Sequence, residues 1–281
     1  MSSGFLGSGI GPTAIKRRGG LAAPVPVAGG ELLTNGGFDV DATWTKEDGW
    51  SIDTGTGVAV KIASAGAANL TQTTAATVGA WHRFTFDILS KGGEYGFLAR
   101  NGGATILPYA NSVGVALWTI RFTSNSIGAR ASAAQYGEID NASCVPLTLS
   151  SLFSTAAYAS ANCDLSAAIT RTAGTQAGLV ARLDSATSPA NFAIAYLDGA
   201  GNVKVDKCVG GTYTNVISGA VTYGSTKILR LVCSGNSVSA YYDGTQVGST
   251  VTVSDAGIVS NTLHGLFSTY ASNSFAGYAA A

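Results

Sequence analysis

The chain of 281 residues has few charged side chains, since Asp, Glu, Lys and Arg make up only 11% of it, against about 25% in a typical globular domain. Its 16 basic and 16 acidic residues cancel. A protein that binds nucleic acid or an anionic membrane surface needs a basic patch, so neither partner is expected. So little charge favours a surface covered by other copies or by a larger assembly, with a Ser/Thr/Asn-rich surface as the alternative.

Long apolar runs are also missing. No stretch approaches the ~20 apolar residues of a membrane-spanning helix, so we expect no membrane insertion. Near the N-terminus, the basic residues Lys16, Arg17 and Arg18 follow the short apolar pair Phe5-Leu6. This order is the reverse of that in a secretory signal, which predicts synthesis in a cytoplasm.

Cysteine and histidine are scarce. Only His82 and His264 are present, and no CxxC spacing occurs, so a zinc site is not expected. Buried free thiols are the expected state in a cytoplasmic product, and pairing of Cys208 with Cys233 is the alternative. The four cysteines are Cys144, Cys163, Cys208 and Cys233.

Residues 1–30 have the pattern of an extended arm. Glycines and the prolines Pro12, Pro24 and Pro26 interrupt every apolar run, and Pro-Val-Pro favours an extended backbone. The arm is either a disordered leader or a docking peptide that becomes ordered on a partner. In the second case its anchors are expected to be Phe5, Leu6, Ile10, Lys16, Arg17 and Arg18.

From Glu31 onward the sequence predicts short strands separated by turns. Between Trp81 and Leu89, apolar and polar residues alternate, as in a half-buried antiparallel strand. The dipeptides Asp198-Gly199 and Asp243-Gly244 supply the positive φ that tight hairpins require. Strands about ten residues apart without intervening helices predict an all-β fold with two antiparallel β-sandwich (jelly-roll) domains, at 31–149 and 150–281.

The first of these domains carries a recognisable pair of end motifs. It opens with Leu32-Leu33-Thr34-Asn35-Gly36-Gly37-Phe38-Asp39, continues through Trp44 and Gly49-Trp50-Ser51-Ile52, and closes with Ile139-Asp140-Asn141-Ala142-Ser143. In these motifs it resembles the galactose-binding-like carbohydrate-binding modules.

The second domain is similar to laminin-G or concanavalin-like jelly rolls, as found in phage structural proteins. The similarity rests on the segments 172–182, 229–233, 238–244 and 265–268, together with Phe275. Paired modules of this kind are common in virion and tail-associated proteins. The resemblance therefore implies a bacteriophage virion protein, made in the host cytoplasm and bound to other capsid or tail proteins.

Sugar binding requires exposed aromatic rings, and all four tryptophans lie in the first domain. Trp50 and Trp81 are expected in the core. Trp44 and Trp118 have polar or loop-like neighbours, so we expect them to form a carbohydrate-binding platform together with Tyr109.

No cofactor is required by any motif, but the resemblance implies a possible structural calcium ion. In related modules the ion lies where the first and last strands meet. That position corresponds to Asp39 and Asp140, with oxygen atoms of Asn35 or Asn141 as helpers, and oxygen ligands of this kind suit a hard cation. Asp39 departs from the usual Glu.

The one segment that suggests catalysis is Gly137-Glu138-Ile139-Asp140. Laminarinase-type jelly rolls use E-x-D-x-x-E, and Ser143 replaces the final Glu here. Glycoside hydrolysis needs two carboxyl groups in acid and nucleophile or base roles, so we expect no enzyme activity. The sequence thus predicts a capsid decoration or tail-appendage protein, homo-oligomeric, that displays glycan-binding domains. A glycan depolymerase and a free bacterial adhesin are the alternatives.

Overall fold

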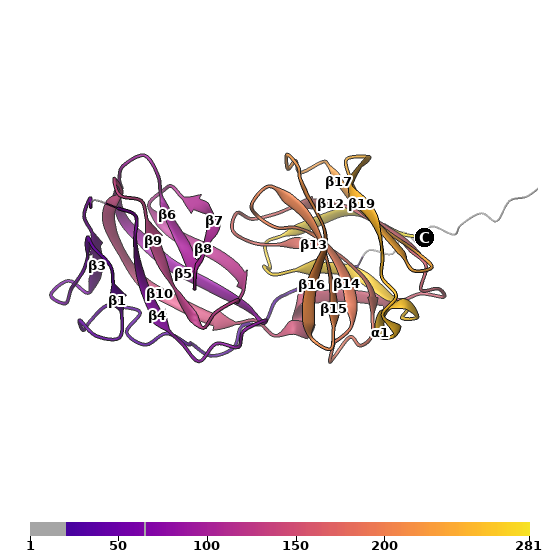
Figure 1. The fold of residues 1–281 in the computed structure, drawn as a ribbon, viewed down its shortest axis with the longest axis horizontal. Helices are drawn as coiled ribbons and strands as arrows, with labels where there is room; N and C mark the ends of the chain where they lie inside the picture. Colours follow the sequence, from indigo (N-terminus) through magenta and orange to yellow (C-terminus); the bar gives the residue numbers. More distant parts are fainter. Residues whose placement is uncertain (1–20, 65) are drawn as a thin grey trace, which may run out of the picture.

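The computed structural model describes residues 21–64 and 66–281, and it confirms the all-β prediction. Two antiparallel sandwiches lie side by side along the long axis (Figure 1). Each contains two sheets. In the described residues the helical elements are η1 (Leu149–Leu152) and α1 (Ala256–Val259), and no helix is long and apolar enough to span a membrane.

The first sandwich pairs two five-stranded sheets. One has the order β1 (Thr45–Lys46), β4 (Ala68–Thr73), β9 (Ser126–Ala131), β6 (Phe97–Asn101) and β7 (Ala104–Ala110). The other has the order β2 (Trp50–Asp53), β3 (Val58–Lys61), β10 (Tyr136–Pro146), β5 (Trp81–Gly92) and β8 (Gly114–Arg121).

The second sandwich pairs a six-stranded sheet with a five-stranded one. The larger has the order β11 (Phe153–Ala157), β20 (Leu263–Ser268), β13 (Ala177–Leu183), β14 (Phe192–Leu197), β15 (Asn202–Val209) and β16 (Thr212–Ala220). The smaller has the order β19 (Thr245–Thr252), β18 (Ser237–Tyr242), β17 (Ile228–Ser234), β12 (Cys163–Thr170) and β21 (Ser274–Ala280).

Strand β5 follows the alternation expected from its sequence. Phe84, Phe86 and Ile88 are buried in the core of the first sandwich, whereas Arg83 and Thr85 are only partly buried. Trp81 belongs to the other face of the strand, yet it is also buried. Its ring points away from the core of the first sandwich and packs against residues of the second one.

Strands β13 and β14 are buried at every residue. Alternating side chains point to opposite faces of a sheet, so both faces of this sheet must be covered. One face forms the core of the second sandwich. The other carries Val180, Ile194 and Phe267, and Trp81 and Leu147 of the first sandwich cover it.

Hydrogen bonds form a polar seam beside this apolar contact. Thr119 N–H donates to Gly174 O at 2.8 Å, and Gln176 Nε2 donates to Thr119 O at 2.9 Å. Gly174 has a φ of +76°, and a Cβ there would lie 1.9 Å from Leu117 O. Only glycine therefore allows this approach of the two backbones.

Residues 21–30, the described part of the expected arm, run beside the connection between the sandwiches. Val27 N–H donates to Ser151 Oγ at 2.8 Å, and Gly29 N–H donates to Pro146 O at 2.8 Å. Leu21 packs against the core of the second sandwich. This segment thus contacts both sides of the junction.

All four cysteines are buried and unpaired, as expected. The alternative pairing of Cys208 with Cys233 is wrong, because Cys208 belongs to the cluster between the sandwiches and Cys233 to the core of the second. Cys233 instead lies opposite Cys163 on the neighbouring strand.

Both histidines are buried. Nδ1 of His264 accepts the Arg182 backbone N–H at 2.9 Å, and its Nε2 lies 3.0 Å from Ser160 O. This pattern requires the neutral ring, with the proton on Nε2. The ring of His82 stacks on Phe122 with centroids 4.0 Å apart.

Replacing Trp81 with Ala should loosen the whole molecule and not only one sandwich. The variant exposes the outer face of β13 and β14, and loss of a buried Trp costs roughly 3–5 kcal/mol of unfolding free energy. Urea denaturation should resolve two transitions in place of one. Trp50→Ala, in the first core, is the matched control and should lower the first sandwich's stability without separating the two. A single unshifted transition in Trp81→Ala would contradict this interface.

Stability should fall as the pH is lowered from about 7.5 to 5.5. Burial lowers the pKa of His82 and of His264 below the ordinary 6.5. Below pH 6.5 the unfolded chain therefore binds more protons than the folded chain, and the free energy of unfolding decreases. Asp53, Asp184 and Asp198 have pKa values below 3.8 and do not titrate in this window.

Urea denaturation across this pH range measures the effect. His264→Gln should show a shallower dependence than the unchanged chain. Equal slopes would show that His264 does not titrate on unfolding.

Candidate functional site

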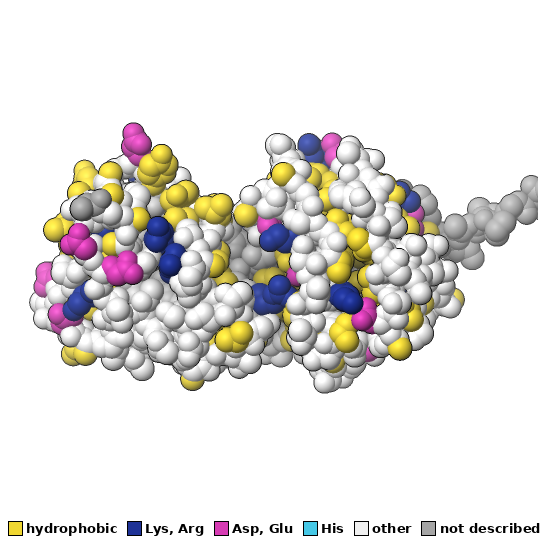
Figure 2. Space-filling view, viewed as in Figure 1, with side chains coloured by type: hydrophobic (Ala, Val, Ile, Leu, Met, Phe, Trp, Pro, Cys, Tyr) yellow, Lys and Arg dark blue, Asp and Glu magenta, His cyan; other side chains and the backbone are white. Residues whose placement is uncertain are grey.

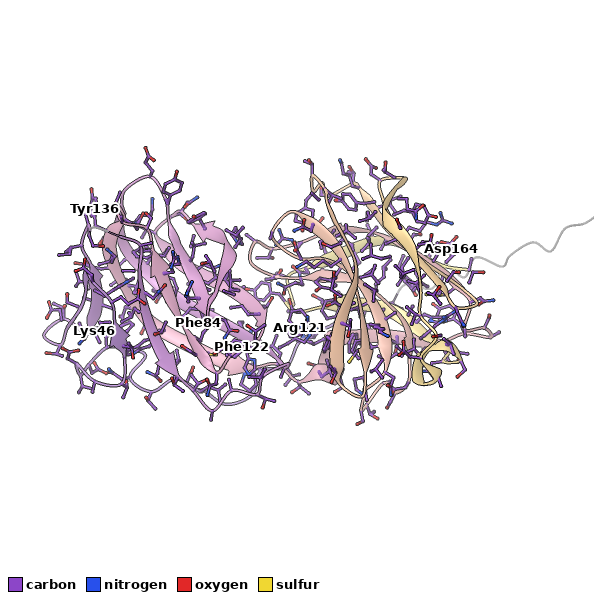
Figure 3. All side chains as sticks on the ribbon, in the orientation of Figure 1. Lys46, Phe84, Arg121, Phe122, Tyr136 and Asp164 are labelled. Carbon is purple, nitrogen blue, oxygen red and sulfur yellow. The ribbon has the colours of Figure 1, made fainter. Side chains whose placement is uncertain are left out.

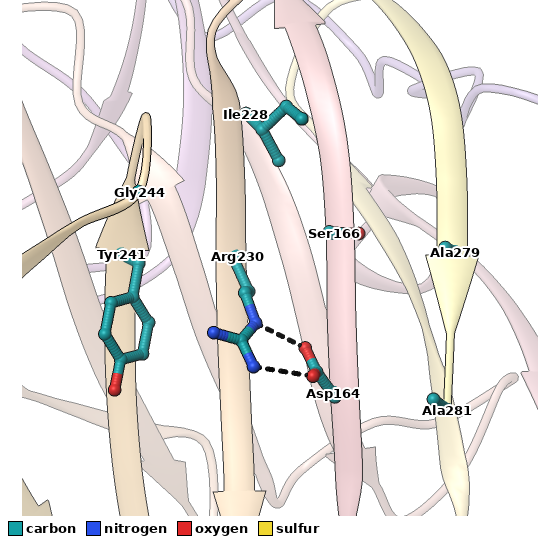
Figure 4. Close-up of a pocket in the computed structure, with 8 residues that line it drawn as sticks. All are labelled: Asp164, Ser166, Ile228, Arg230, Tyr241, Gly244, Ala279 and Ala281. Carbon is teal, nitrogen blue, oxygen red and sulfur yellow. Dashed lines mark hydrogen bonds and ion pairs between the residues drawn. The ribbon is translucent and has the colours of Figure 1, made fainter. Parts of the chain in front are cut away.

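A hollow of about 390 Å³ lies on the outer face of the five-stranded sheet of the second sandwich (Figure 4). Strand alternation places its side chains there. Along β12, Cys163 and Leu165 point into the core, so Asp164 and Ser166 point outward. Arg230 of β17 and Tyr241 of β18 lie on the same face. We call Asp164, Ser166, Arg230 and Tyr241 the sheet-face site.

Arg230 is the centre of this site. Its Nε and Nη2 each donate to one carboxylate oxygen of Asp164 at 2.7 Å, a bidentate geometry that fixes both groups. Its Cζ lies 5.1 Å from the centre of the Tyr241 ring. The hydrogen bonds to Asp164 raise the pKa of Arg230, so the guanidinium stays charged.

The site therefore offers an aromatic ring beside a rigid array of donors and acceptors. Arg230 and Asp164 are 44% and 40% exposed in their side chains. The bidentate pair uses only Nε and Nη2 of Arg230 and one lone pair of each Asp164 oxygen, so both groups keep further hydrogen-bonding capacity for a ligand. Ile228 and Ala279 supply apolar surface at the edge of the hollow.

Two of the three predicted sugar-stacking residues lie in the core, and the prediction for them is wrong. Trp118 is 1% exposed and packs on Phe84 and Phe86, and Trp44 is 7% exposed and packs on Phe38. Their polar neighbours in the sequence do not expose them: strand alternation turns the ring of Trp118 inward, and the ring of Trp44, which precedes β1, is buried against Phe38. Each indole N–H donates to a backbone carbonyl.

Tyr109, the third residue, is 38% exposed and has an exposed aromatic neighbour in Tyr95, at 51%. The two rings lie 5.6 Å apart at 36°. Trp118 fixes the backbone next to Tyr109, since its Nε1 donates to Pro108 O. We call Tyr95 and Tyr109 the tyrosine platform.

The predicted calcium ligands and their helpers take part in local hydrogen bonds. Asp140 Oδ1 accepts the N–H of Asn141 at 2.6 Å. The Asn35 side chain bonds to the backbone of Val40, which shapes the turn that contains Asp39. In the part of the chain that the structure describes, no group of three or more His, Cys, Asp or Glu side chains could hold a metal ion. The calcium site stays a prediction.

The segment Gly137-Glu138-Ile139-Asp140 lies beside an acidic residue that the sequence did not reveal. Asp140 of β10 lies opposite Asp87 of β5, and Asn141 Nδ2 donates to Asp87 Oδ2 at 2.9 Å. Ser143, at the position of the missing Glu, donates to Glu31. Asn141 and Ser143 of this strand are therefore hydrogen-bonded to acidic side chains of other segments.

The proposed docking anchors Phe5, Leu6, Ile10, Lys16, Arg17 and Arg18 lie outside the described residues. The sheet-face site was itself missed from the sequence, although Tyr241 and Tyr242 are consecutive strand residues that must point to opposite faces. Tyr242 is indeed the buried one. Only strand pairing shows that Arg230 lies directly across from Tyr241 and Ser166.

Comparisons with known proteins found similar structures only. No family model matches the sequence, and no curated protein matches it. The structure is similar to the carbohydrate-binding module CBM66 from Bacillus subtilis, with 11% identity over 85% of this chain and 91% of that one and a TM-score of 0.33.

Two further matches are the CBM40 of the Ruminococcus gnavus IT-sialidase bound to α2,3-sialyllactose and a prokaryotic β-1,3-1,4-glucanase (lichenase) derived from a mouse hindgut metagenome. The first has 11% identity, covers 37% of this chain and 61% of that one, and has a TM-score of 0.28. The second has 10% identity, covers 91% and 95%, and has a TM-score of 0.31. These similar structures are carbohydrate-binding modules and a glycoside hydrolase, and at such TM-scores they carry no argument about what this chain binds.

Proposed function

We propose that this chain is a non-enzymatic carbohydrate-binding protein. The observation that carries the proposal is the sheet-face site, where Tyr241, Arg230 and Asp164 lie side by side on three neighbouring strands (Figure 4). A sugar ring has an apolar C–H face and a rim of hydroxyls. It therefore suits an aromatic ring flanked by fixed hydrogen-bonding groups.

The rigidity of the site supports this function. The bidentate Arg230–Asp164 pair holds both groups in one geometry before a ligand arrives, which reduces the side-chain entropy lost on binding. The hollow of about 390 Å³ has the size of a short saccharide segment. Weak individual contacts would add up if many copies were displayed together.

The charge of the site supports binding without turnover. Asp164 is the one carboxylate among the described lining residues, and Arg230 is bound to it. Hydrolysis of a glycosidic bond needs two carboxyl groups about 5–5.5 Å apart, or roughly 6.5–9.5 Å apart with a water between them. Among the side chains that line the hollow, Asp164 has no second carboxylate to act with it.

Binding of the full chain to a glycan array tests this function. Tyr241→Ala and Arg230→Met should each weaken the affinity for any bound glycan at least about tenfold, since each removes one side of the site. Tyr109→Ala, on the other sandwich, is the control and should bind like the unchanged chain. Thermal melting should show that all three variants fold.

Three outcomes would contradict the proposal. Binding to no glycan would exclude the function, and loss of binding only in Tyr109→Ala would move it to the tyrosine platform. Release of reducing ends from a bound glycan would make the protein an enzyme.

We also infer the setting in which these domains work, which is the outside of a bacteriophage particle, as a capsid decoration or tail-appendage component. The resemblance of both sandwiches to virion modules supports this, as does the low charge of the surface (Figure 2). Residues 1–30 would dock on other virion proteins through Phe5, Leu6, Ile10 and the basic cluster at 16–18, and the copies would form a homo-oligomer.

Copy counting by mass spectrometry in purified particles tests the setting. The full chain should be present in many copies, and a chain lacking residues 2–20 should be lost from the particles, because the proposed anchors are removed while the described residues stay intact. A chain that is absent from particles in both forms would overturn the virion location, whatever the array shows.

A further inference from the structure

A groove of about 290 Å³ opens between the two sandwiches. We call it the interdomain groove. Figure 2 shows the hollow between the two bodies with basic side chains along it, and Figure 3 places Arg121 at this boundary, away from Asp164. Residues of both sandwiches that line it include Thr105, Leu107, Arg121, Thr123, Asp198 and Lys204.

Arg121 is held in this groove without hydrogen bonds. Its side chain is 27% exposed, and its Nη2 lies 3.5 Å from Asp206 Oδ2. Its Cζ lies 4.4 Å from the centre of the Tyr213 ring. Within residues 21–64 and 66–281 its guanidinium donates no hydrogen bond, and Nη1 is buried without a partner. A guanidinium has five N–H donors, and leaving buried donors unpaired is costly.

The nearby carboxylate of Asp206 does not accept a hydrogen bond from the Arg121 guanidinium. Asp206 is 1% exposed, and its oxygens accept Tyr196 Oη–H at 3.0 Å and Asn215 Nδ2 at 2.8 Å. Neutral donors thus take the hydrogen bonds, and Arg121 keeps a longer ionic contact only. Arg121 also lines the groove with 27% of its side chain exposed, so the exposed part of its guanidinium can bind a second anion.

Lys204 provides a second cation in the same groove. Its Nζ lies 3.1 Å from Asp198 Oδ2, and Asp198 is fixed by the N–H groups of Ala200 and Asn202 at 2.8 and 3.0 Å. Burial opposes the charge on Asp198, but these hydrogen bonds outweigh it and lower its pKa. An ammonium has three N–H donors. The contact with Asp198 therefore positions Lys204 and leaves it donors for a ligand.

We propose that the interdomain groove binds an acidic saccharide, with the carboxylate of a uronic acid at Arg121 and Lys204. The lining has two cations and one carboxylate, in a chain whose net charge is zero. Thr105 and Thr123 supply hydroxyls for the sugar rim, and Leu107 supplies apolar surface for its C–H face. The inference rests on the proposed carbohydrate-binding function for its class of ligand, and it uses different residues.

Calorimetric titration of the full chain with uronic acid trimers tests the inference. Galacturonate, glucuronate and mannuronate trimers should be compared with their neutral methyl esters. At least one acid should bind, and its ester should bind at least about tenfold more weakly, because the ester removes only the charge. High salt should weaken binding of the acid.

Variants of one strand provide the matched control. Lys204→Met should weaken binding at least about tenfold, whereas Lys207→Met should not. Lys207 lies on the same strand, β15, but it pairs with Asp255 outside the groove, so its variant removes the same charge from a different place. Arg121→Gln should resemble Lys204→Met, with its melting temperature measured to check the interface. Lys204 lies at the exposed rim, so its variant does not depend on that check.

The inference is overturned if acid and ester bind equally, if none of the three acids binds, or if Lys204→Met and Lys207→Met behave alike. Loss of acid binding in Arg230→Met and not in Lys204→Met would place the acidic sugar at the sheet-face site. In that case the proposed function stands and the groove is not a binding site. Binding of acid in the groove, without any effect of Tyr241→Ala on other glycans, would leave the groove correct and the sheet-face site wrong.

Discussion

The packing of Trp81 against the six-stranded sheet is the contact on which the rest of the structure depends. That sheet has two apolar faces, and a sandwich covers only one of them. Trp81 lies 5.7 Å from the ring of Phe267 and 6.3 Å from that of Tyr196, where water would otherwise meet an apolar surface. Burial of apolar area stabilises by about 25 cal/mol per Å². The two sandwiches are therefore joined by a core of their own.

Polar groups inside this contact determine its geometry. Gln176, Thr119 and Thr269 are buried and bonded to one another across the junction. A buried polar group without a partner is costly, so this network tolerates only one arrangement of the sandwiches. Arg121 lines the groove together with Thr119 and Gln176 of this network. The feature that fixes the sandwiches thus also creates the groove between them.

The arrangement leaves two distinct surfaces for ligands. The sheet-face site lies on the five-stranded sheet, which is the side of the second sandwich that faces away from the interface, and the groove lies beside the interface itself. With few charges and no net charge, the molecule has little long-range field to steer a ligand. Recognition would then depend on local geometry, which a rigid two-sandwich body maintains.

The sequence by itself determined the fold class and most strands, because alternation and Asp-Gly turns are local signals. It gave no sign of β9, whose Ala and Gly residues look like a loop; there a Cβ on Gly128 would lie 1.9 Å from Leu70 O of the neighbouring strand. Tyr109 was predicted at the surface correctly, whereas Trp44 and Trp118 were not, since polar neighbours do not reveal which way a ring points. Only the tertiary structure brought Arg230 beside Tyr241 and placed Arg121 and Lys204 in one groove, because strand pairing and the packing of two sandwiches join residues that are distant in sequence.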